Sequence, residues 1–431
     1  MSTAVMLFTR DLRVHDNPAL RAACAGAERL VPLFVFDPRV RTSPGRQRFL
    51  IESLEDLRAS LRMRGGDLVV RRGDPVGETI AVARSVEATS IMLSADVSGY
   101  AVRRQRRLAE AAAAHRLRVE LHDGVTVVPP GALRPVTGGC HYRIFTPYWR
   151  VWRDHPRRAE LPAPRRVRFP DEVARGAWPP VTGPPNDGFP GGESAARRRL
   201  DAWTGDASRY AGARDTLSAD ATSRLSPYLH FGCVSPLTVE IAAGAADAFV
   251  RQLCWRDFYH QTLAAFPALG REPYRPHRRE DWRDDADALA AWQEGRTGVP
   301  IVDAGMRQLV AEGFMHNRAR LITASFLTSL LRLDWREGAD WYARWLLDAD
   351  VANNYGNWQW VAGTGTDTRP YRRFSPLRQA QRFDPHGAYV RRWVPELADL
   401  PGRTVHEPWL LPPGLLRDLR YEPPLAVEAT L

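Results

Sequence analysis

The sequence predicts an α/β N-terminal domain, built on a doubly wound, Rossmann-like parallel sheet, followed by a mostly α-helical C-terminal domain. Two observations predict this order. In residues 1–128, short apolar segments typical of buried strands alternate with longer segments of helical periodicity. In residues 193–431 the helical periodicity continues and the strand pattern is absent. The Pro- and Gly-rich stretch between them, residues 129–192, indicates a long surface connection.

The first domain is expected to contain five buried strands, at residues 4–9, 30–36, 68–71, 91–93 and 118–121. Helices are expected between them, at 18–25, 48–63, 76–86 and 100–115. Right-handed crossovers of this kind make the strands parallel, so a ligand should lie at the carboxyl ends of the strands. Neither GxGxxG nor GxxxxGK[ST] occurs in this domain, so the usual phosphate-binding fingerprints are missing.

The second domain shows helical patterns at 250–265, 286–293, 302–312 and 318–331. Arginine and aromatic residues interleave throughout it, and the chain contains 14 Trp. Most of these side chains should belong to the core. Electron transfer is a second role open to them, and spacing in the sequence does not decide between the two.

The 431 residues suffice for two or three domains, and 44% apolar with 26% charged residues exclude wholesale disorder. The 60 basic residues, all arginine, exceed the 50 acidic residues and give a formal net charge of +10. This charge favours anionic partners such as nucleic acid, although a solvated basic surface explains the same composition.

The four cysteines form no CxxC pair and are too few for a disulfide framework, so a reducing cytoplasm is the expected location. The N-terminal sequence MSTAVMLFTRDL predicts a first buried strand and no signal peptide. The longest apolar stretch, 321–331, is shorter than the roughly 20 residues of a membrane span. No membrane association is therefore expected.

Three segments place polar and aromatic side chains together. In TSRLS at 222–226, hydroxyls and an arginine precede an apolar helical pattern, with Ser226 expected as the N-cap and Pro227 in the first turn. Such a helix start can bind an anion, although ordinary helix capping explains the same residues.

Gln252 and Trp255 share a helix face, beside Arg256. They can stack on and hydrogen-bond an unpaired base, or form an ordinary half-buried surface.

Asn317 and Arg320 repeat this spacing, and Asp348 and Asp350 offer acidic partners. A buried Arg–Asp pair is costly unless it is well satisfied, so it tends to be kept for function. A solvated salt bridge, which contributes little to stability, is the alternative.

These segments, in this order, resemble the photolyase/cryptochrome family, and most closely its bacterial class I cyclobutane pyrimidine dimer members. The resemblance covers nearly the whole chain, weakly through the first third and densely from Tyr210 to Trp409, and its most specific stretches are 300–327 and 334–367. It implies an antenna-chromophore domain at 1–128, a linker at 129–192 and a helical FAD-binding catalytic domain at 193–431. The FAD is expected to be bent within the helical domain, which accounts for the missing Rossmann fingerprint.

The resemblance also implies the residues that contact FAD. They are Tyr210, Thr222, Ser223, Arg224, Leu225, Ser226, Gln252, Asn317, Arg320, Asp348, Ala349, Asp350 and Asn354. Asp348 is expected to pair with Arg320. The neutral amide of Asn354 is expected to face flavin N5, where it stabilises the reduced, anionic cofactor without adding negative charge. Trp358, Trp335 and Trp282 match the family's electron path from flavin to surface.

The implied activity is that of a deoxyribodipyrimidine photo-lyase, a carbon–carbon lyase that repairs UV-damaged DNA in light. Photoexcited reduced FAD gives one electron to a flipped-out cyclobutane pyrimidine dimer, the dimer splits into monomers, and the electron returns. Trp255 and Trp360 are expected to stack on the dimer, with Gln252 and Asn354 as further catalytic residues. The implied DNA contacts are Arg214, Gln252, Trp255, Arg256, Asn317, Arg318, Leu321, Trp360 and Gln379. The family suggests a monomer without a metal ion.

The chain departs from the family pattern at two positions. Gln252 stands where the best-studied bacterial members have Glu, and Ser375 stands where Asn is usual. An amide donates to a thymine carbonyl without needing a proton, so the contact can survive. (6-4) photolyases also carry Gln there, but they need a His pair, and the matching positions are Asn317 and Leu321. A (6-4) photolyase and a cryptochrome-type blue-light photoreceptor are the alternatives. Two features favour repair over a photoreceptor: the neutral Asn354, and the lack of a long extension after Trp409.

The first domain is expected to hold a second, antenna chromophore, with 8-hydroxy-5-deazaflavin favoured over methenyltetrahydrofolate. Arg46 and Asp96 stand at the positions that contact deazaflavin in the family. Backbone and apolar contacts would come from Phe34, Val35 and Phe36. The folate type uses a Glu a little later, and Gly99-Tyr100 offers none. An empty pocket, with Asp96 as a simple turn residue, is the alternative.

Overall fold

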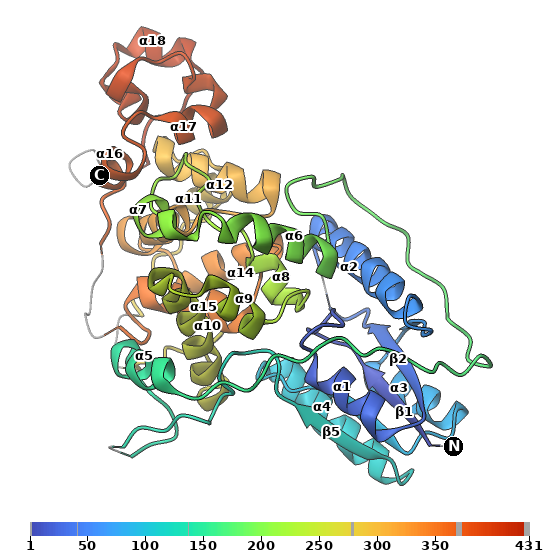
Figure 1. Ribbon diagram of the computed structural model, residues 1–431. Helices are drawn as coiled ribbons and strands as arrows, with labels where there is room; N and C mark the ends of the chain where they lie inside the picture. The colour runs from blue at the N-terminus through green and yellow to red at the C-terminus, as the bar shows by residue number, and fades with distance from the viewer. Residues whose placement is uncertain (1, 41, 137, 277–279, 368–372, 426–431) are drawn as a thin grey trace. The chain divides into compact units, whose positions relative to one another are not determined.

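The computed structural model describes residues 2–40, 42–136, 138–276, 280–367 and 373–425, the side chain of Leu416 excepted. By internal packing the chain divides into two units (Figure 1). The first unit comprises Met1–Ala207 and Ser223–Pro267, and the second comprises Ser208–Thr222 and Ala268–Leu431. This division groups 223–267 with the N-terminal sheet, whereas the resemblance implies domain bounds at 128 and 193, which stay a prediction.

The first unit contains the five-stranded parallel sheet that the sequence predicts. The strands are β1 (Thr3–Leu7), β2 (Arg29–Phe36), β3 (Val69–Arg72), β4 (Ser90–Ser94) and β5 (Arg118–His122). Their order is β3-β2-β1-β4-β5, and each neighbouring pair is parallel. β1 and β4 are buried along their whole length, because helices cover both faces of the sheet.

Four helices connect these strands, and each begins at a side chain that accepts a backbone N–H. They are α1 (Pro18–Gly26), α2 (Pro44–Arg62), α3 (Pro75–Ser85) and α4 (Gly99–Ala113), capped by Asn17, Ser43, Asp74 and Ser98. α1 packs on β1 and β4, while α3 packs on β1, β2 and β3. Polar side chains cap all four helix starts, and a proline occupies the first turn of α1, α2 and α3.

The connection after the sheet is less irregular than its Pro and Gly content indicates. It contains a helix, α5 (Phe145–Asp154), which buries Phe145, Tyr148, Trp149 and Trp152. The part of the connection at residues 168–175 lies beside the sheet, because Leu30 N–H donates to Arg168 O and Val70 N–H donates to Arg175 O, both at 2.8 Å. The sequence analysis expects a long surface connection here and names no helix in it, so α5 was missed.

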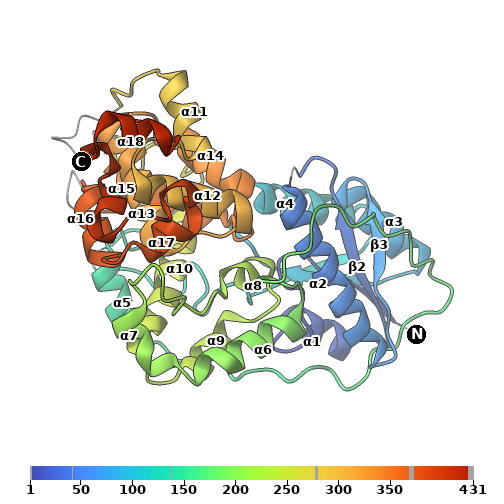
Figure 2. The same ribbon diagram turned by 90° about the horizontal axis from the view of Figure 1, so that it is seen from above.

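The first unit continues as α-helices. They are α6 (Glu193–Thr204), α8 (Ser226–Phe231), α9 (Pro236–Ala243) and α10 (Asp247–Ala265). α6 lies beside α2 (Figure 2). Glu193, the first residue of α6, accepts the Val14 amide at 2.7 Å, so the helices of this unit are tied to the loop after β1.

Among the described residues of the second unit, the regular structure is helical apart from one isolated bridge, Arg283 to Leu333. Its α-helices are α7 (Tyr210–Ala213), α11 (Ala286–Glu294), α12 (Pro300–Glu312), α13 (Asn317–Ser325), α14 (Trp335–Trp345), α15 (Val351–Ala362), α16 (Pro376–Phe383), α17 (Ala388–Trp393) and α18 (Pro413–Asp418). Shorter 3₁₀ segments are η1 (Ala207–Arg209, at the unit boundary), η3 (Pro395–Leu397), η4 (Gly402–His406) and η5 (Pro408–Leu410). The helix predicted at 318–331 changes at Phe326 to a π-helical turn, η2 (Phe326–Leu330).

Within the described ranges, no helix combines the length and the apolar character that crossing a bilayer requires. The four cysteines, Cys24, Cys140, Cys233 and Cys254, are free thiols. Burial raises the pKa of the Cys24 thiol to about 11 and that of the Cys233 thiol to about 12, so both stay protonated at neutral pH.

Candidate functional site

In the second unit, Arg320 and Asp348 form a largely buried ion pair. Arg320 Nη2 lies 2.9 Å from Asp348 Oδ2, and Arg320 Nε donates to Met315 O at 2.8 Å. The other oxygen of Asp348, Oδ1, is buried and accepts no hydrogen bond from the described residues. A buried carboxylate oxygen without a donor is costly, so this atom is suited to accept a hydrogen bond from a bound molecule.

Asp350 has a different local role from Asp348. Its Oδ1 accepts from the backbone and the side-chain nitrogen of Asn353, both at 2.8 Å, and so caps α15. Its own N–H donates to Asp348 O at 2.5 Å. Ala349 between them is half-buried. The start of α15 thus fixes the backbone that carries Asp348.

Asn354 lies one turn into α15. Its Nδ2 donates to Ala339 O on α14 at 2.8 Å, which fixes the orientation of the amide. No donor to the amide oxygen occurs among the residues described. The side chain therefore presents a neutral acceptor, and its expected place beside the flavin stays a prediction.

A second ionic group in this unit involves Arg318. Its Nε and Nη2 bind the two oxygens of Asp215 at 2.8 and 2.7 Å. Its backbone N–H donates to His316 Nδ1 at 3.1 Å, and burial lowers the pKa of His316 to about 4, so this histidine is neutral. The guanidinium of Arg318 is thus committed to a carboxylate, and its predicted DNA contact stays a prediction.

The second unit contains further predicted site residues. Tyr210 is buried, which raises the pKa of its hydroxyl, and the Arg214 guanidinium lies 5.8 Å from its ring centroid. Asn317 is exposed, whereas Leu321, Trp360 and Gln379 are half-buried. Thr222 ends the first segment of this unit and is half-buried as well.

The three tryptophans of the predicted electron path pack against one core. Trp335 and Trp358 are 0% and 2% exposed, and neither indole N–H has a hydrogen-bond partner within the described residues. A Cβ atom on Gly338 would lie 2.2 Å from the Trp358 ring, so Trp358 rests on α14 one turn after Trp335. The segment of Trp282 is joined to the start of α14 because Arg283 N–H donates to Arg332 O at 2.8 Å.

In the first unit, the loop before α8 is held by local contacts. Arg224 has a φ of +50°, a left-handed conformation that is strained for a non-glycine residue, and Leu225 N–H donates to Ser223 Oγ at 3.4 Å. Ser226 is the first helical residue, and Leu225 occupies the N-cap position without a side-chain cap. The prediction that Ser226 caps the helix was therefore wrong, because Leu225 already has helical φ and ψ.

The predicted base-binding face lies on α10 of this unit. Gln252 and Trp255 are half-buried, and the Trp255 ring stacks on Phe145 of α5 at 3.6 Å between centroids. Arg256 behaves differently: it is 8% exposed and donates to Val125 O at 2.6 Å and to Leu229 O at 3.4 Å. Its contact with DNA stays a prediction, because its guanidinium is engaged by backbone carbonyls.

The predicted antenna residues lie at or near the carboxyl ends of the strands. Phe34 and Phe36 of β2 make an edge contact at 5.0 Å, and Arg46 lies in the first turn of α2. Asp96, after β4, is 7% exposed and accepts from Arg10 Nη1 at 3.3 Å and from Ser98 N at 2.9 Å. The sequence analysis missed Arg10. Its positive charge compensates the buried Asp96 carboxylate and lowers the free-energy cost of burying it.

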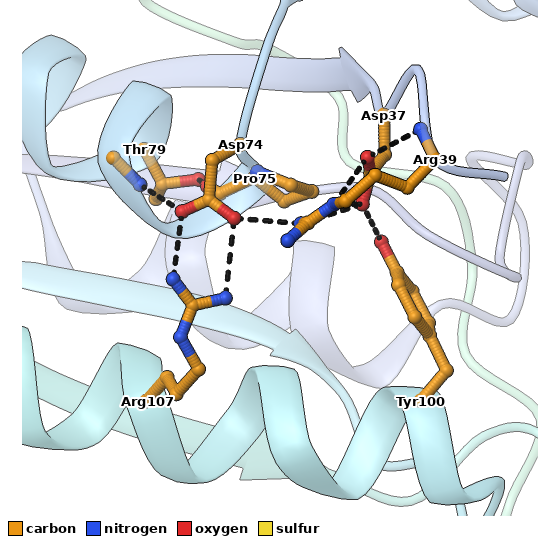
Figure 3. Close-up of polar contacts among 8 residues, drawn as sticks. Asp37, Arg39, Asp74, Pro75, Thr79, Tyr100 and Arg107 are labelled. Atoms are coloured by element: carbon orange, nitrogen blue, oxygen red, sulfur yellow. Dashed lines mark hydrogen bonds and ion pairs between the residues drawn. The ribbon is translucent and has the colours of Figure 1, made fainter.

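A series of ion pairs and hydrogen bonds also lies at the carboxyl ends of β2 and β3 (Figure 3). Tyr100 Oη donates to Asp37 at 2.6 Å, Arg39 Nη2 bridges Asp37 and Asp74 at 2.8 and 2.7 Å, and Arg107 donates twice to Asp74 at 3.1 Å. Hydrogen bonding by Arg39 lowers the pKa of Asp37 to about 2. These contacts tie α4 to the turns that follow β2 and β3.

Comparison with known proteins identifies the chain. The family description "DNA photolyase" matches residues 4–165, and "FAD binding domain of DNA photolyase" matches residues 249–423. A deoxyribodipyrimidine photo-lyase of Streptomyces griseus is 49% identical over 95% of this chain and 93% of its own. The chain belongs to the photolyase/cryptochrome family. A cryptochrome DASH of Gloeobacter violaceus is 36% identical, with 96% of this chain and 90% of its own covered.

Solved structures of photolyases share the fold. A class III photolyase from Agrobacterium tumefaciens has a TM-score of 0.90 at 32% identity, with 100% of this chain and 95% of that chain covered. An archaeal photolyase from Sulfolobus tokodaii with two FAD molecules has a TM-score of 0.87 at 28% identity, with 99% and 96% covered. Both photolyase domains are therefore present, and the FAD-binding match contains Arg320, Asp348 and Asn354.

Proposed function

We propose that the protein is a light-dependent deoxyribodipyrimidine photo-lyase that uses FAD to split cyclobutane pyrimidine dimers in DNA. The observation that carries this proposal is the 49% identity over 95% of the chain with a photo-lyase, because the match includes both units. FAD, when bound, supplies the absorption of light and the electron that opens the dimer. The residues of the chain supply binding, orientation and electrostatics.

The second unit has side chains suited to hold FAD. The unsatisfied oxygen of Asp348 fits a hydroxyl or N–H donor, and Arg320 balances its charge. The amide oxygen of Asn354 accepts a hydrogen bond without bringing a negative charge beside a reduced, anionic flavin. We assign Tyr210 and residues 222–226 to the rest of the cofactor by resemblance to the family.

Replacing Asp348 with asparagine is expected to weaken FAD binding roughly 10- to 150-fold, since a hydrogen bond to a charged group contributes about 1.5–3 kcal/mol. The variant is Asp348→Asn, and the measurement is titration of FAD into the flavin-depleted protein, followed by fluorescence. Asp340→Asn is the matched control, because Asp340 is an exposed carboxylate that accepts from Tyr355 Oη at 2.6 Å. Equal FAD affinity in Asp348→Asn and the wild type would rule out the assignment.

We assign recognition of the lesion to Gln252, Trp255 and Trp360. A dimer pairs poorly with the opposite strand, so flipping it out of the duplex costs less than flipping a normal base. The Gln252 amide can donate to a pyrimidine carbonyl at any pH. The alternative of a (6-4) photolyase is disfavoured by Asn317 and Leu321, which stand where that chemistry needs histidines. The neutral Asn354 favours repair over a cryptochrome photoreceptor.

Truncation of Trp255 to alanine is expected to lower the preference for damaged over intact DNA roughly 5- to 150-fold, because stacking contributes about 1–3 kcal/mol per base. The preference is measured as the ratio of dissociation constants for two duplexes that differ only by one dimer. Trp393→Ala on α17 is the control, since nothing assigns that residue to DNA. A Trp255→Ala ratio equal to that of the wild type would remove Trp255 from the lesion site.

For the first unit we propose an antenna chromophore of the 8-hydroxy-5-deazaflavin type, held by Arg46 and Asp96. Two observations support this proposal. Phe34 and Phe36 form an apolar surface for an aromatic chromophore, and the buried Asp96, paired with Arg10, supplies a polar contact at the carboxyl ends of the strands. Chromatography of the chromophores released by denaturation tests this proposal, and release of folate or of a second flavin would contradict it.

We also propose that the protein is a monomer in the cytoplasm, which gel filtration and cell fractionation would test.

One experiment tests the main proposal. The purified protein, with its flavin reduced, is mixed with an oligonucleotide that contains a cyclobutane dimer and exposed to blue light. We expect restoration of the two pyrimidines in light and none in the dark. A protein with fully reduced bound flavin that leaves the dimer intact would reject repair and favour a photoreceptor.

A further inference from the structure

The aromatic ring of Phe145 lies flat against the indole of Trp255. The ring centroids are 3.6 Å apart and the planes differ by 4°. Phe145 is the first residue of α5, in the part of the chain that connects the sheet to the later helices. Both residues belong to the first unit, so the contact lies within one compact body.

Two neighbours restrict the Phe145 ring further. Arg251, one turn before Trp255 on α10, places its guanidinium carbon 5.2 Å from the Phe145 centroid. Phe258, which is fully buried, meets Phe145 at 88° and Trp255 at 89°, with centroid distances of 5.7 and 5.5 Å. One ring that stands edge-on to both partners keeps their planes parallel.

Hydrogen bonds hold the chain before Phe145 by its backbone and the helix after it by a side chain. Before it, Tyr142 N–H donates to Gln261 Oε1 at 3.0 Å, and Gln261 Nε2 donates to Tyr142 O at 2.8 Å. After it, Trp152 Nε1 donates to Asp257 Oδ2 at 2.9 Å. All these partners lie on α10, so α5 is anchored to the helix that carries Trp255.

We propose that Phe145 is a positioning residue for Trp255 in lesion recognition. Phe145 covers one face of the indole and fixes its plane, which leaves the opposite face to stack on a flipped-out pyrimidine. Binding then does not have to order a mobile side chain, and this preorganisation adds to affinity for the lesion. The inference rests on the proposed function, because it assumes that Trp255 meets the lesion.

The test compares Phe145→Leu with Phe145→Tyr and with Tyr148→Leu. Leucine fills the space without a ring, so the preference for damaged over intact DNA should fall roughly 2- to 10-fold, the factor that corresponds to an aromatic pair. Tyrosine keeps the ring and should restore the preference. Tyr148 is also on α5 and packs on Phe258 at 5.6 Å, but it has no ring contact with Trp255. Its truncation should lower the melting temperature and leave the preference unchanged.

The outcomes separate the inference from the function on which it rests. Loss of preference in Phe145→Leu, with rescue by tyrosine and normal affinity for intact DNA, supports the positioning role. An unchanged preference in Phe145→Leu, while Trp255→Ala loses it, overturns the role of Phe145 alone. An equal loss in Tyr148→Leu also overturns it, because the effect would then follow stability. Absence of dimer repair by the wild type would reject the proposed function itself.

Discussion

Replacing Trp335 with phenylalanine is expected to reduce the rate of flavin photoreduction to a small fraction of the wild-type rate. Repair by protein whose flavin has been reduced chemically beforehand should stay at the wild-type rate. Trp335 is fully buried, and it lies one turn from Gly338, on which the Trp358 ring rests. Phenylalanine keeps most of the packing but is far harder to oxidise than an indole. The expected defect is therefore confined to electron supply through this position.

The two rates are measured by the loss of oxidised-flavin absorbance under blue light with a thiol present, and by dimer repair after dithionite reduction. Trp341→Phe is the control, because Trp341 is on the same helix but pairs with Trp345 at 5.8 Å. Two results would contradict the assignment. One is equal loss of photoreduction and repair in Trp335→Phe, and the other is the same photoreduction defect in Trp341→Phe.

Substitution of Asp257 by asparagine is expected to change how the stability of the protein depends on pH. Burial is the main cause that raises the pKa of Asp257 from 3.8 to about 6, and Arg256, at 3.8 Å, offsets this only in part. The folded protein thus binds the proton more tightly than the unfolded chain. The stability that Asp257 contributes is complete below pH 4 and falls as the pH rises to about 6.

Asparagine has no such titration. The free energy of unfolding of Asp257→Asn minus that of the wild type should therefore increase by about 2.5 kcal/mol between pH 4 and pH 7. Urea unfolding at a series of pH values measures this difference. A difference that stays flat over this range would show that the carboxylate is not destabilised by burial.

Asp67→Asn is the control, and its expected sign is opposite. Burial alone would raise the pKa of Asp67, but hydrogen bonds from Arg58 and Arg62 outweigh it and lower the value to about 2. Asp67 therefore stabilises the fold above pH 4, and this contribution is lost as the pH falls toward 2. The two variants should respond to pH in opposite directions.

The sequence was sufficient to predict the five strands and the four helices that connect them. β1 and β4 are buried on both faces, so each is an almost continuous apolar run that periodicity detects. Asn17, Asp74 and Ser98 mark helix starts by local chemistry that needs no distant partner. The resemblance to the photolyase/cryptochrome family is likewise carried by continuous stretches of sequence, 300–327 and 334–367, and can be recognised without knowing the tertiary structure.

Helix α5 was missed although its signal is present. In α5, Phe145, Tyr148, Trp149 and Trp152 follow the spacing of one helix face, but Pro and Gly on both sides obscured it. That omission matters because α5 carries the ring that stacks on Trp255. A search for aromatic residues at i, i+3, i+4 and i+7 would have found it.

By itself, then, the sequence determined the order of strands and helices, the family and the side chains available for chemistry. Only the tertiary structure decided which of those side chains have partners. It pairs Arg318 with Asp215, surrounds Arg256 with the carbonyls of Val125 and Leu229, and leaves one oxygen of Asp348 without a donor. The physical reason is that burial pattern and capping act over a few neighbouring residues, whereas the partner of a charged group comes from a segment far away in the chain.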